Sequence, residues 1–271
     1  MTSIVTRPRI VAAAFVAAFV AAFAALGAVS RSSPTAAGVT AAGPIPYAPW
    51  YWTMAVSSAD SNVILLGTSN GIYRSTDAAK TWHPTGPKGV NTTSLVDAGN
   101  AIYAGGVPGP NPVIRKGSGR TAPDGPAVLL VSTDGGKLWR ILHPTGLPNV
   151  TIQALAVAQS GHLVAGDMDR GGFLSTNGKV WQKTPFVDSR GGKMVMEYAV
   201  QPTDTAHVLM TSVGIESSSD GGKTWHLALK SNVMFGPVAW APSASDVAYA
   251  IGFDRSFWRS DDGGKTWAKV S

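Results

Sequence analysis

Acidic and basic side chains gather in three short, glycine-containing segments of this chain. The segment GDMDRGG contains Asp167, Asp169 and Arg170, FVDSRGGK contains Asp188 and Arg190, and GFDRS contains Asp254 and Arg255. Such pairs can neutralise one another as surface salt bridges. They can also line a polar pocket for an anionic or sugar ligand, because a guanidinium group binds a carboxylate through two parallel hydrogen bonds. Asp167 and Asp254 are in addition candidate catalytic carboxylates.

Glu197 is one of only two glutamates in the chain and stands in the apolar run MVMEYAV. A lone carboxylate in an apolar strand is a candidate general acid or base with a raised pKa. A hydrogen bond to a neighbouring loop, or exposure to solvent, explains such a residue equally well. Tyr198 follows it, but adjacent strand residues point to opposite faces, so the two side chains cannot pair directly.

Several other chemistries are excluded by the composition. The chain has no cysteine, which excludes disulfides, cysteine-ligated metals and a thiol nucleophile. GDMDRGG is not a phosphate-binding loop, because no G-K-[ST] segment follows it directly. The D-x-D spacing of Asp167 and Asp169 is not followed by a calcium ligand set. We therefore expect no metal and no cofactor.

The first 31 residues read as an export leader. Arg7 and Arg9 precede an uncharged apolar run over residues 10–29, and small residues follow it. This pattern is typical of a cleaved signal peptide, but twenty apolar residues are also long enough for a retained membrane anchor. Either alternative places the rest of the chain outside the cytoplasm, secreted, periplasmic or at the cell surface. Residues 32–46 are rich in Ser, Ala, Gly and Pro and predict a flexible linker.

The positive charge of the chain is weak evidence for a nucleic-acid partner. The formal net charge is +6, but three of the arginines lie in the leader, and the remainder has 19 basic and 16 acidic residues, a net charge of +3. We expect no nucleic-acid partner and contact with a membrane only through residues 10–29 if the leader is retained.

The rest of the chain consists of five copies of one unit. The copies are STDAAKTW, STDGGKLW, STNGKVW, SSDGGKTW and SDDGGKTW, which begin at residues 75, 132, 175, 218 and 260. Each copy follows a short strand-like run, and two further runs lie upstream, so each unit predicts four short strands joined by turns. Units of about 43 residues with four strands are typical of β-propeller blades. We therefore expect an all-β propeller over residues 47–271, with five blades at about 50–86, 91–143, 150–185, 193–229 and 233–271.

The recurring segment resembles the Asp-box (BNR) repeat, S-x-D-x-G-x-T-W, of the sialidase-like superfamily. The resemblance implies a structural turn between the third and fourth strands of each blade, in which Asp accepts backbone hydrogen bonds and Trp packs on the sheet. The Asp-box residues are Asp77 and Trp82, Asp134 and Trp139, Asn177 and Trp181, Asp220 and Trp225, and Asp262 and Trp267. Ala78 and Ala79 replace the glycines of the first copy, and Asn177 replaces Asp in the third.

One insertion interrupts the regular spacing of the units. Residues 106–127 lengthen the second unit and carry Arg115 and Arg120. In a propeller the loops between blades, and between the second and third strands, form the ligand face. Long loops on a compact scaffold bind ligands or serve only as connections. The insertion is therefore a candidate ligand lid or partner contact, or else a passive loop.

The resemblance leaves two functions open. Sialidases are Asp-box enzymes, and a retaining hydrolase needs two carboxyl groups about 5 Å apart or a Tyr activated by a carboxylate; Glu197 with a loop Asp and Arg residues is the candidate here. The chain lacks the F/Y-R-I-P segment of sialidases. Photosystem II assembly factors and sortilin-type proteins use similar propellers without catalysis. We expect an exported bacterial monomer that binds a protein or glycan through its loop face. Ring closure rests on the first and last blades, or on a second chain.

Overall fold

The computed structural model describes residues 45–109, 127–158 and 161–271, which form eighteen β-strands and no α-helix. The prediction of an all-β chain is confirmed for these residues. The leader, most of the linker, and Arg115 and Arg120 of the insertion lie outside the described residues. No helix in the described part of the chain is long and apolar enough to cross a membrane.

Three four-stranded sheets and one six-stranded sheet follow one another along the chain, and every pair of neighbouring strands is antiparallel. The first sheet contains β1 (Tyr51–Val56), β2 (Ile64–Thr68), β3 (Gly71–Ser75) and β4 (His83–Thr85). The second contains β5 (Val90–Asp97), β6 (Ile102–Pro108), β7 (Val128–Ser132) and β8 (Arg140–Leu142). The third contains β9 (Ala154–Val157), β10 (Leu163–Asp167), β11 (Gly171–Ser175) and β12 (Gln182–Lys183).

The fourth sheet contains β13 (Glu197–Val200), β14 (Val208–Ser218), β15 (His226–Ala241), β16 (Ala244–Gly252), β17 (Phe257–Ser260) and β18 (Ala268–Lys269). Two of its strands, β14 and β15, pair with different neighbours along different parts of their length. Residues 208–211 of β14 pair with β13, and residues 213–217 pair with β15. The first half of β15 pairs with β14, and its second half pairs with β16. The long strands β14 and β15 therefore connect β13 on one side with β16–β18 on the other in one continuous sheet.

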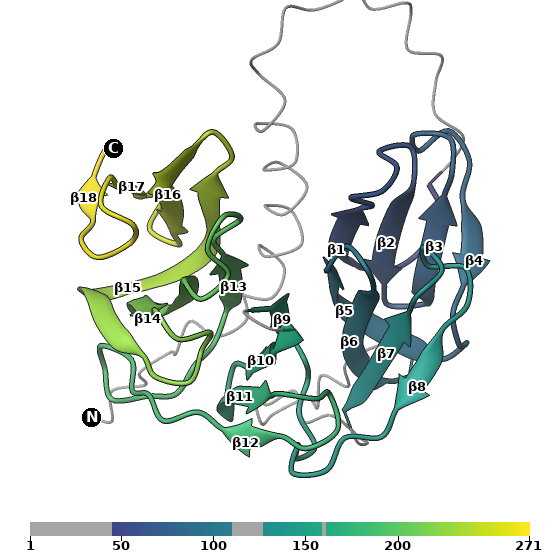
Figure 1. Ribbon diagram of the computed structural model, residues 1–271, viewed down its shortest axis with the longest axis horizontal. Helices are drawn as coiled ribbons and strands as arrows, with labels where there is room; N and C mark the ends of the chain where they lie inside the picture. Colours follow the sequence, from purple (N-terminus) through teal and green to yellow (C-terminus); the bar gives the residue numbers. More distant parts are fainter. Residues whose placement is uncertain (1–44, 110–126, 159–160) are drawn as a thin grey trace, which may run out of the picture.

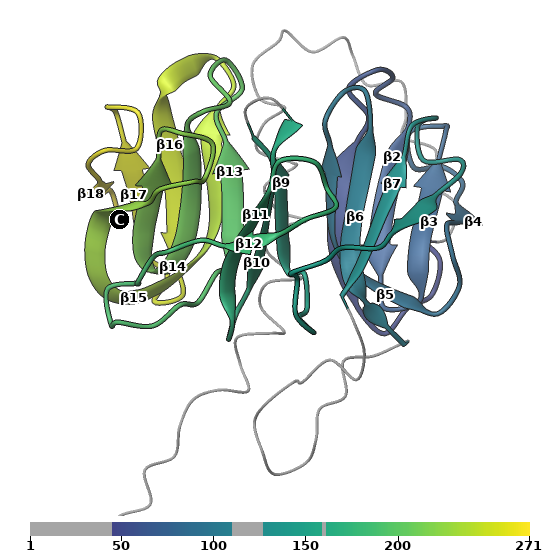
Figure 2. The same ribbon diagram turned by 60° about the horizontal axis from the view of Figure 1, so that its bottom comes forward.

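The sheets stand around a common centre like the blades of a propeller (Figures 1 and 2). The first strand of each sheet lies on the inner side, and β1 packs against β5, β5 against β9, and β9 against β13. In Figure 1 the series forms an arc that is open between the first sheet and β16–β18. Within the described ranges, no packing of comparable extent joins these two ends.

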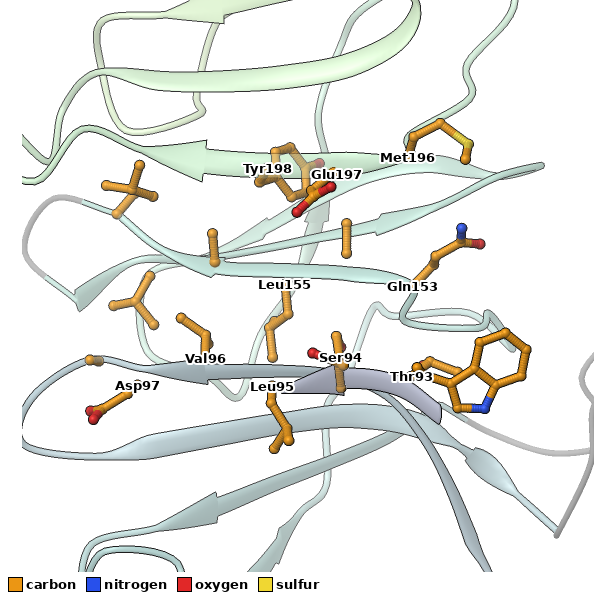
Figure 3. A pocket seen from close by; sticks show the side chains of 18 of the residues that line it. Thr93, Ser94, Leu95, Val96, Asp97, Gln153, Leu155, Met196, Glu197 and Tyr198 are labelled. Carbon is orange, nitrogen blue, oxygen red and sulfur yellow. The ribbon is translucent and has the colours of Figure 1, made fainter. Parts of the chain in front are cut away.

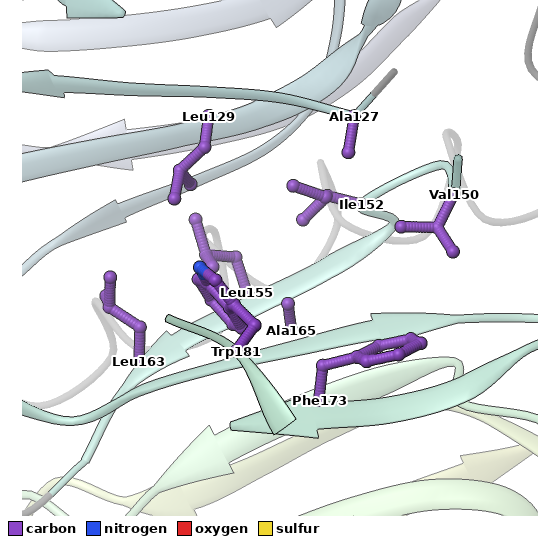
Figure 4. Packing of buried hydrophobic residues seen from close by; sticks show 9 residues of the cluster. All are labelled: Ala127, Leu129, Val150, Ile152, Leu155, Leu163, Ala165, Phe173 and Trp181. Carbon is purple, nitrogen blue, oxygen red and sulfur yellow. The ribbon is translucent and has the colours of Figure 1, made fainter. Parts of the chain in front are cut away.

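The core consists of apolar layers between neighbouring sheets. Adjacent residues of one strand point to opposite faces, so a single strand fills two layers. In β7, Leu129 packs toward the third sheet and Leu130 toward the first. Figure 4 shows the layer that contains Leu129, Ile152, Phe173 and Trp181. Because the middle sheets are covered on both faces, their strands β7, β9 and β10 are mostly apolar runs without a polar side.

Glycines on the second strands let neighbouring sheets approach closely. A Cβ atom added at Gly105 would lie 2.4 Å from Ile152 Cγ2, and one at Gly166 would lie 2.2 Å from Val195 Cγ1. Such contacts are far shorter than van der Waals packing allows. These glycines therefore set the spacing between the inner strands of adjacent sheets.

The five recurring turns share one hydrogen-bond pattern. In the second turn the Ser132 hydroxyl donates to Asp134 at 2.8 Å, and the amides of Lys137 and Leu138 donate to the same carboxylate at 3.0 Å. The third turn uses the Asn177 amide oxygen in the same way. In the first turn, Ala78 and Ala79 adopt φ values of 56° and 69°, which glycines adopt in the other turns. Four of these turns join β3 to β4, β7 to β8, β11 to β12, and β17 to β18, and the fourth turn along the chain joins β14 to β15.

Candidate functional site

A central cavity of about 830 Å³ lies inside the arc, bounded by the first strands β1, β5, β9 and β13. This volume is typical of small-ligand sites. Its middle section is lined by small or apolar side chains, among them Met54, Val96, Ala154 and Leu155. We call this space the channel.

The channel has two ends of different composition. The loop-side mouth lies where the first strands begin and is lined by Trp52, Asn91, Thr93, Gln153 and Asp169. The far end lies beyond the carboxyl ends of the same strands and is lined by Asp97, Asn100, Gly161 and Gln201. In Figure 3, Thr93 and Gln153 mark one end and Asp97 the other. The loop-side mouth is also where β6 ends and β7 begins, because Asn91 pairs with Val107 in the second sheet.

Glu197 lines the middle of the channel at the start of β13 (Figure 3). Its side chain is half-buried, and no other described residue forms a hydrogen bond or ion pair with its carboxyl group. Desolvation alone raises its pKa to about 8. The group is therefore mostly protonated at neutral pH and can donate a hydrogen bond.

Tyr198 points away from Glu197, as strand alternation requires. Its ring packs between the third and fourth sheets, and its hydroxyl donates to the carbonyl of Ala165 at 3.3 Å. Burial raises the pKa of the phenol. Tyr198 is therefore a buried packing residue with no access to the Glu197 carboxyl group.

Asp167 also lines the channel, but backbone groups already occupy its carboxylate. One oxygen accepts from the amides of Asp169 and Arg170 at 2.8 and 2.7 Å, and the other accepts from Thr151 at 3.0 Å. Burial raises its pKa, and these hydrogen bonds oppose the rise. Asp167 thus stabilises the turn between β10 and β11 and links that turn by a hydrogen bond to Thr151, in the segment that precedes β9.

The other two Asp/Arg segments close turns outside the channel. Asp188 accepts from the amides of Arg190 and Gly192, and the Arg190 guanidinium donates to the carbonyl of Asn232. Asp254 accepts from the amide and the hydroxyl of Ser256, which lowers its pKa.

The Asp/Arg pairs predicted from the sequence do not line one common pocket. Arg255, beside Asp254, has a φ of 72° in its tight turn. Asp169 borders a second, shallower depression that Arg170 shares with Lys183. None of the predicted Asp/Arg pairs forms an ion pair within the described residues.

A second unusual carboxyl group was not singled out from the sequence. Glu216 is fully buried in β14, and the Ser212 hydroxyl lies 2.8 Å from both of its oxygens. Burial raises its pKa to about 8, and the nearby Asp188 contributes to the rise. The repeat alignment could have pointed to Glu216, because it stands two residues before Ser218, at the position that Tyr73 occupies before Ser75 in the first unit. Glu216 does not line the channel.

The charge of the channel wall limits what it can bind. The described residues that line it include Asp97, Asp167, Asp169 and Glu197, but no Lys, Arg or His. An anionic ligand would therefore find no positive partner among them. No group of three or more His, Cys, Asp or Glu side chains in the described chain is placed to hold a metal ion.

Comparison with known proteins supports the fold. The sequence matches no family model and no curated protein. Among solved structures, it is similar to an ancestral GH74 enzyme, with 18% identity and a TM-score of 0.64 over 84% of this chain and 34% of that one. It is similar to the extracellular domain of BT4673 from B. thetaiotaomicron, with 12% identity and a TM-score of 0.58 over 82% and 28%.

YCF48 from Cyanidioschyzon merolae matches with 16% identity and a TM-score of 0.48 over 83% of this chain and 86% of that one. The chain spans about a third of the length of the GH74 enzyme. At such low identities, the similarity to the GH74 enzyme and the BT4673 domain extends to the β-propeller-like fold and not to an activity.

Proposed function

We propose that the protein is an exported, non-catalytic β-propeller of five blades that binds a protein or glycan partner at its loop-side mouth. The two-partner pairing of β14 and β15 supports the blade count, because it divides the fourth sheet into two blade-like sets. The apolar leader with its preceding arginines supports export, with the chain released or held by residues 10–29.

The observation that carries the proposal is the channel itself. It is an 830 Å³ space that opens among loops and strand ends contributed by separate sheets. Rigid scaffolds that present such loops commonly bind ligands there. The insertion joins β6 to β7 at the same end, so in this proposal it contributes to the binding face.

Site-specific photocrosslinking tests this proposal. A photoreactive amino acid would replace Gln153 at the loop-side mouth or Asn100 at the far end, in the full chain expressed in the producing organism. We expect covalent adducts from position 153 and few from position 100. Equal adducts from both positions, or none from either, would contradict the proposal. Replacing residues 108–126 by a short glycine turn should reduce the adducts while the melting temperature stays nearly unchanged.

A glycoside hydrolase that uses Glu197 is the second candidate. The observation in its favour is the pKa of about 8, which would make Glu197 a general acid at neutral pH. A retaining mechanism also needs a free carboxylate nearby, whereas Asp167 accepts three backbone hydrogen bonds and Asp254 does not line the channel.

Chromogenic substrates test the hydrolase directly. The full chain would be incubated with a panel of aryl glycosides that includes sialosides. Turnover that is abolished by Glu197→Gln would favour the hydrolase over the binding protein. Absence of turnover across the panel would leave the binding function as the better explanation.

A further inference from the structure

Several polar groups at the loop-side mouth have no partner within the described residues. Both side-chain atoms of Asn91, Nδ2 and Oδ1, are buried and unpaired, and so is Nε1 of Trp52. Asn91 is 0% exposed. A buried polar atom without a hydrogen bond is costly, about 1–3 kcal/mol by mutational data. These atoms are closed to solvent in this structure, so a bound molecule or one bridging water satisfies them only when the side chains at the mouth turn to admit it.

An aromatic pair stands at the same place. Trp50 and Trp52 stack with their ring centroids 5.8 Å apart and an angle of 25° between their planes. Trp52 lines the channel, and Trp50 is 37% exposed. A partly exposed indole offers a flat apolar surface beside polar groups, which suits a ligand that presents C–H groups on one side and hydroxyl groups at its edge.

The charges of the wall argue against an ionic ligand. No described basic residue lines the channel, so an anion lacks a partner. A basic peptide is the other ligand that an acidic wall suggests. However, Asp97 accepts from the amides of Ser58 and Gly99, and Asp167 accepts three backbone hydrogen bonds. Glu197, whose pKa is about 8, is mostly uncharged at neutral pH. Asp169 is then the one charged carboxylate of the lining that accepts no hydrogen bond from another described residue. The chain beyond the leader also carries a net positive charge, which disfavours a basic ligand.

We propose that the loop-side mouth binds an uncharged oligosaccharide, with one sugar ring against the Trp50–Trp52 pair and its hydroxyl groups directed to Asn91 and Gln153. Hydroxyl groups donate and accept, as the carboxamides of Asn91 and Gln153 do. Gln153 lines the mouth on the neighbouring sheet and is half-buried. The inference rests on the proposed function, because it names the ligand of the same mouth.

Calorimetric titration of the full chain in mild detergent tests the inference. The probes are cellotetraose, xylotetraose, mannotetraose, maltotetraose and chitotetraose, with sialyllactose and tetralysine as charged comparisons. We expect at least one neutral tetrasaccharide to bind with a Kd of about 1 mM or tighter. Trp50→Ala and Gln153→Ala should each weaken that binding roughly tenfold. The matched control Asn100→Ala removes a carboxamide at the far end and should leave the Kd within about twofold.

The outcomes separate this inference from the proposed function. Gln153 is half-buried, so Gln153→Ala with an unchanged melting temperature tests the site even if Trp50→Ala fails to fold. Failure of all five neutral probes to bind would overturn the inference, as would tighter binding of tetralysine or sialyllactose than of any of them. If the neutral probes fail while crosslinking at position 153 still succeeds, the ligand class is wrong and the proposed function stands.

Discussion

Replacing Glu197 by Gln should change the pH dependence of stability. The folded protein holds this carboxyl group in the channel wall with a pKa of about 8, against 4.5 when it is exposed. Between these values the folded state binds a proton that the unfolded state has released. Stability contributed by Glu197 is therefore complete below pH 4.5 and falls as the pH rises toward 8. Gln resembles the protonated acid in shape and does not titrate, so the variant lacks this loss.

The magnitude follows from the shift of the pKa. Each pH unit between the two values costs about 1.4 kcal/mol, so at pH 7 the wild type has lost about 3 kcal/mol relative to pH 4. The Glu197→Gln variant should match the wild type near pH 4 and exceed it by about 3 kcal/mol at pH 7. For a domain of this size that difference corresponds to about 6–12 °C in melting temperature.

Thermal and guanidinium unfolding of both proteins from pH 4 to pH 9 measures the difference. The difference curve isolates Glu197, because the wild type and the variant share Glu216 and every other carboxyl group. Asp246→Asn removes a carboxyl group from an exposed position and serves as the matched control. Parallel pH profiles for the wild type and Glu197→Gln would refute the placement of an unpaired, desolvated acid in the channel.

Substitutions at three further places test the scaffold. The double change Ala78→Gly with Ala79→Gly should raise the free energy of unfolding by about 1 kcal/mol, because both alanines have left-handed φ angles; an unchanged guanidinium midpoint would argue against strain in this turn. Asp220→Ala removes hydrogen bonds from two amides and two hydroxyl groups of its turn and should cost about 2–3 kcal/mol. Asp220→Asn should keep part of that stability, because the Asn177 amide oxygen accepts backbone hydrogen bonds in the same way in the third turn. If chemical unfolding shows equal losses for Asp220→Ala and Asp220→Asn, the side-chain acceptor does not stabilise the turn. Gly166→Ala should lower the free energy of unfolding by about 1–3 kcal/mol, because the added methyl group would collide with Val195. A double-mutant cycle with Val195→Ala should give a coupling energy of at least about 0.5 kcal/mol. Additive effects would indicate that β10 does not approach the segment before β13 at this point.

Much of the fold was predictable because its causes are local. Serine and aspartate two residues apart, followed by glycines, form the same hydrogen-bonded turn wherever they occur, so the serine spacing predicted where each third strand ends. The alternation of side chains along a strand correctly predicted that Glu197 and Tyr198 would diverge. The number of blades stays a prediction, because β14 and β15 run continuously through the positions where separate blades would divide.

The candidate site was less predictable. The sequence predicts Asp167, Asp188 and Asp254 as candidate site residues, and only Asp167 of the three lines the channel. Each accepts hydrogen bonds from groups within four residues of its own position. A turn-closing aspartate and a ligand-binding aspartate have the same sequence context. Only the positions of the surrounding amides distinguish them.

By itself, the sequence determined an all-β chain built from repeated strand–turn units, because strand alternation and turn chemistry depend on residues close together in the chain. The tertiary structure decided which side chains share the channel. Trp52, Asn91, Gln153 and Glu197 come from four segments that are separated by more than thirty residues each, and they meet because four sheets pack side by side. The raised pKa of Glu197 and the unpaired groups of Asn91 result from that packing, since desolvation and the lack of a partner are properties of the assembled wall.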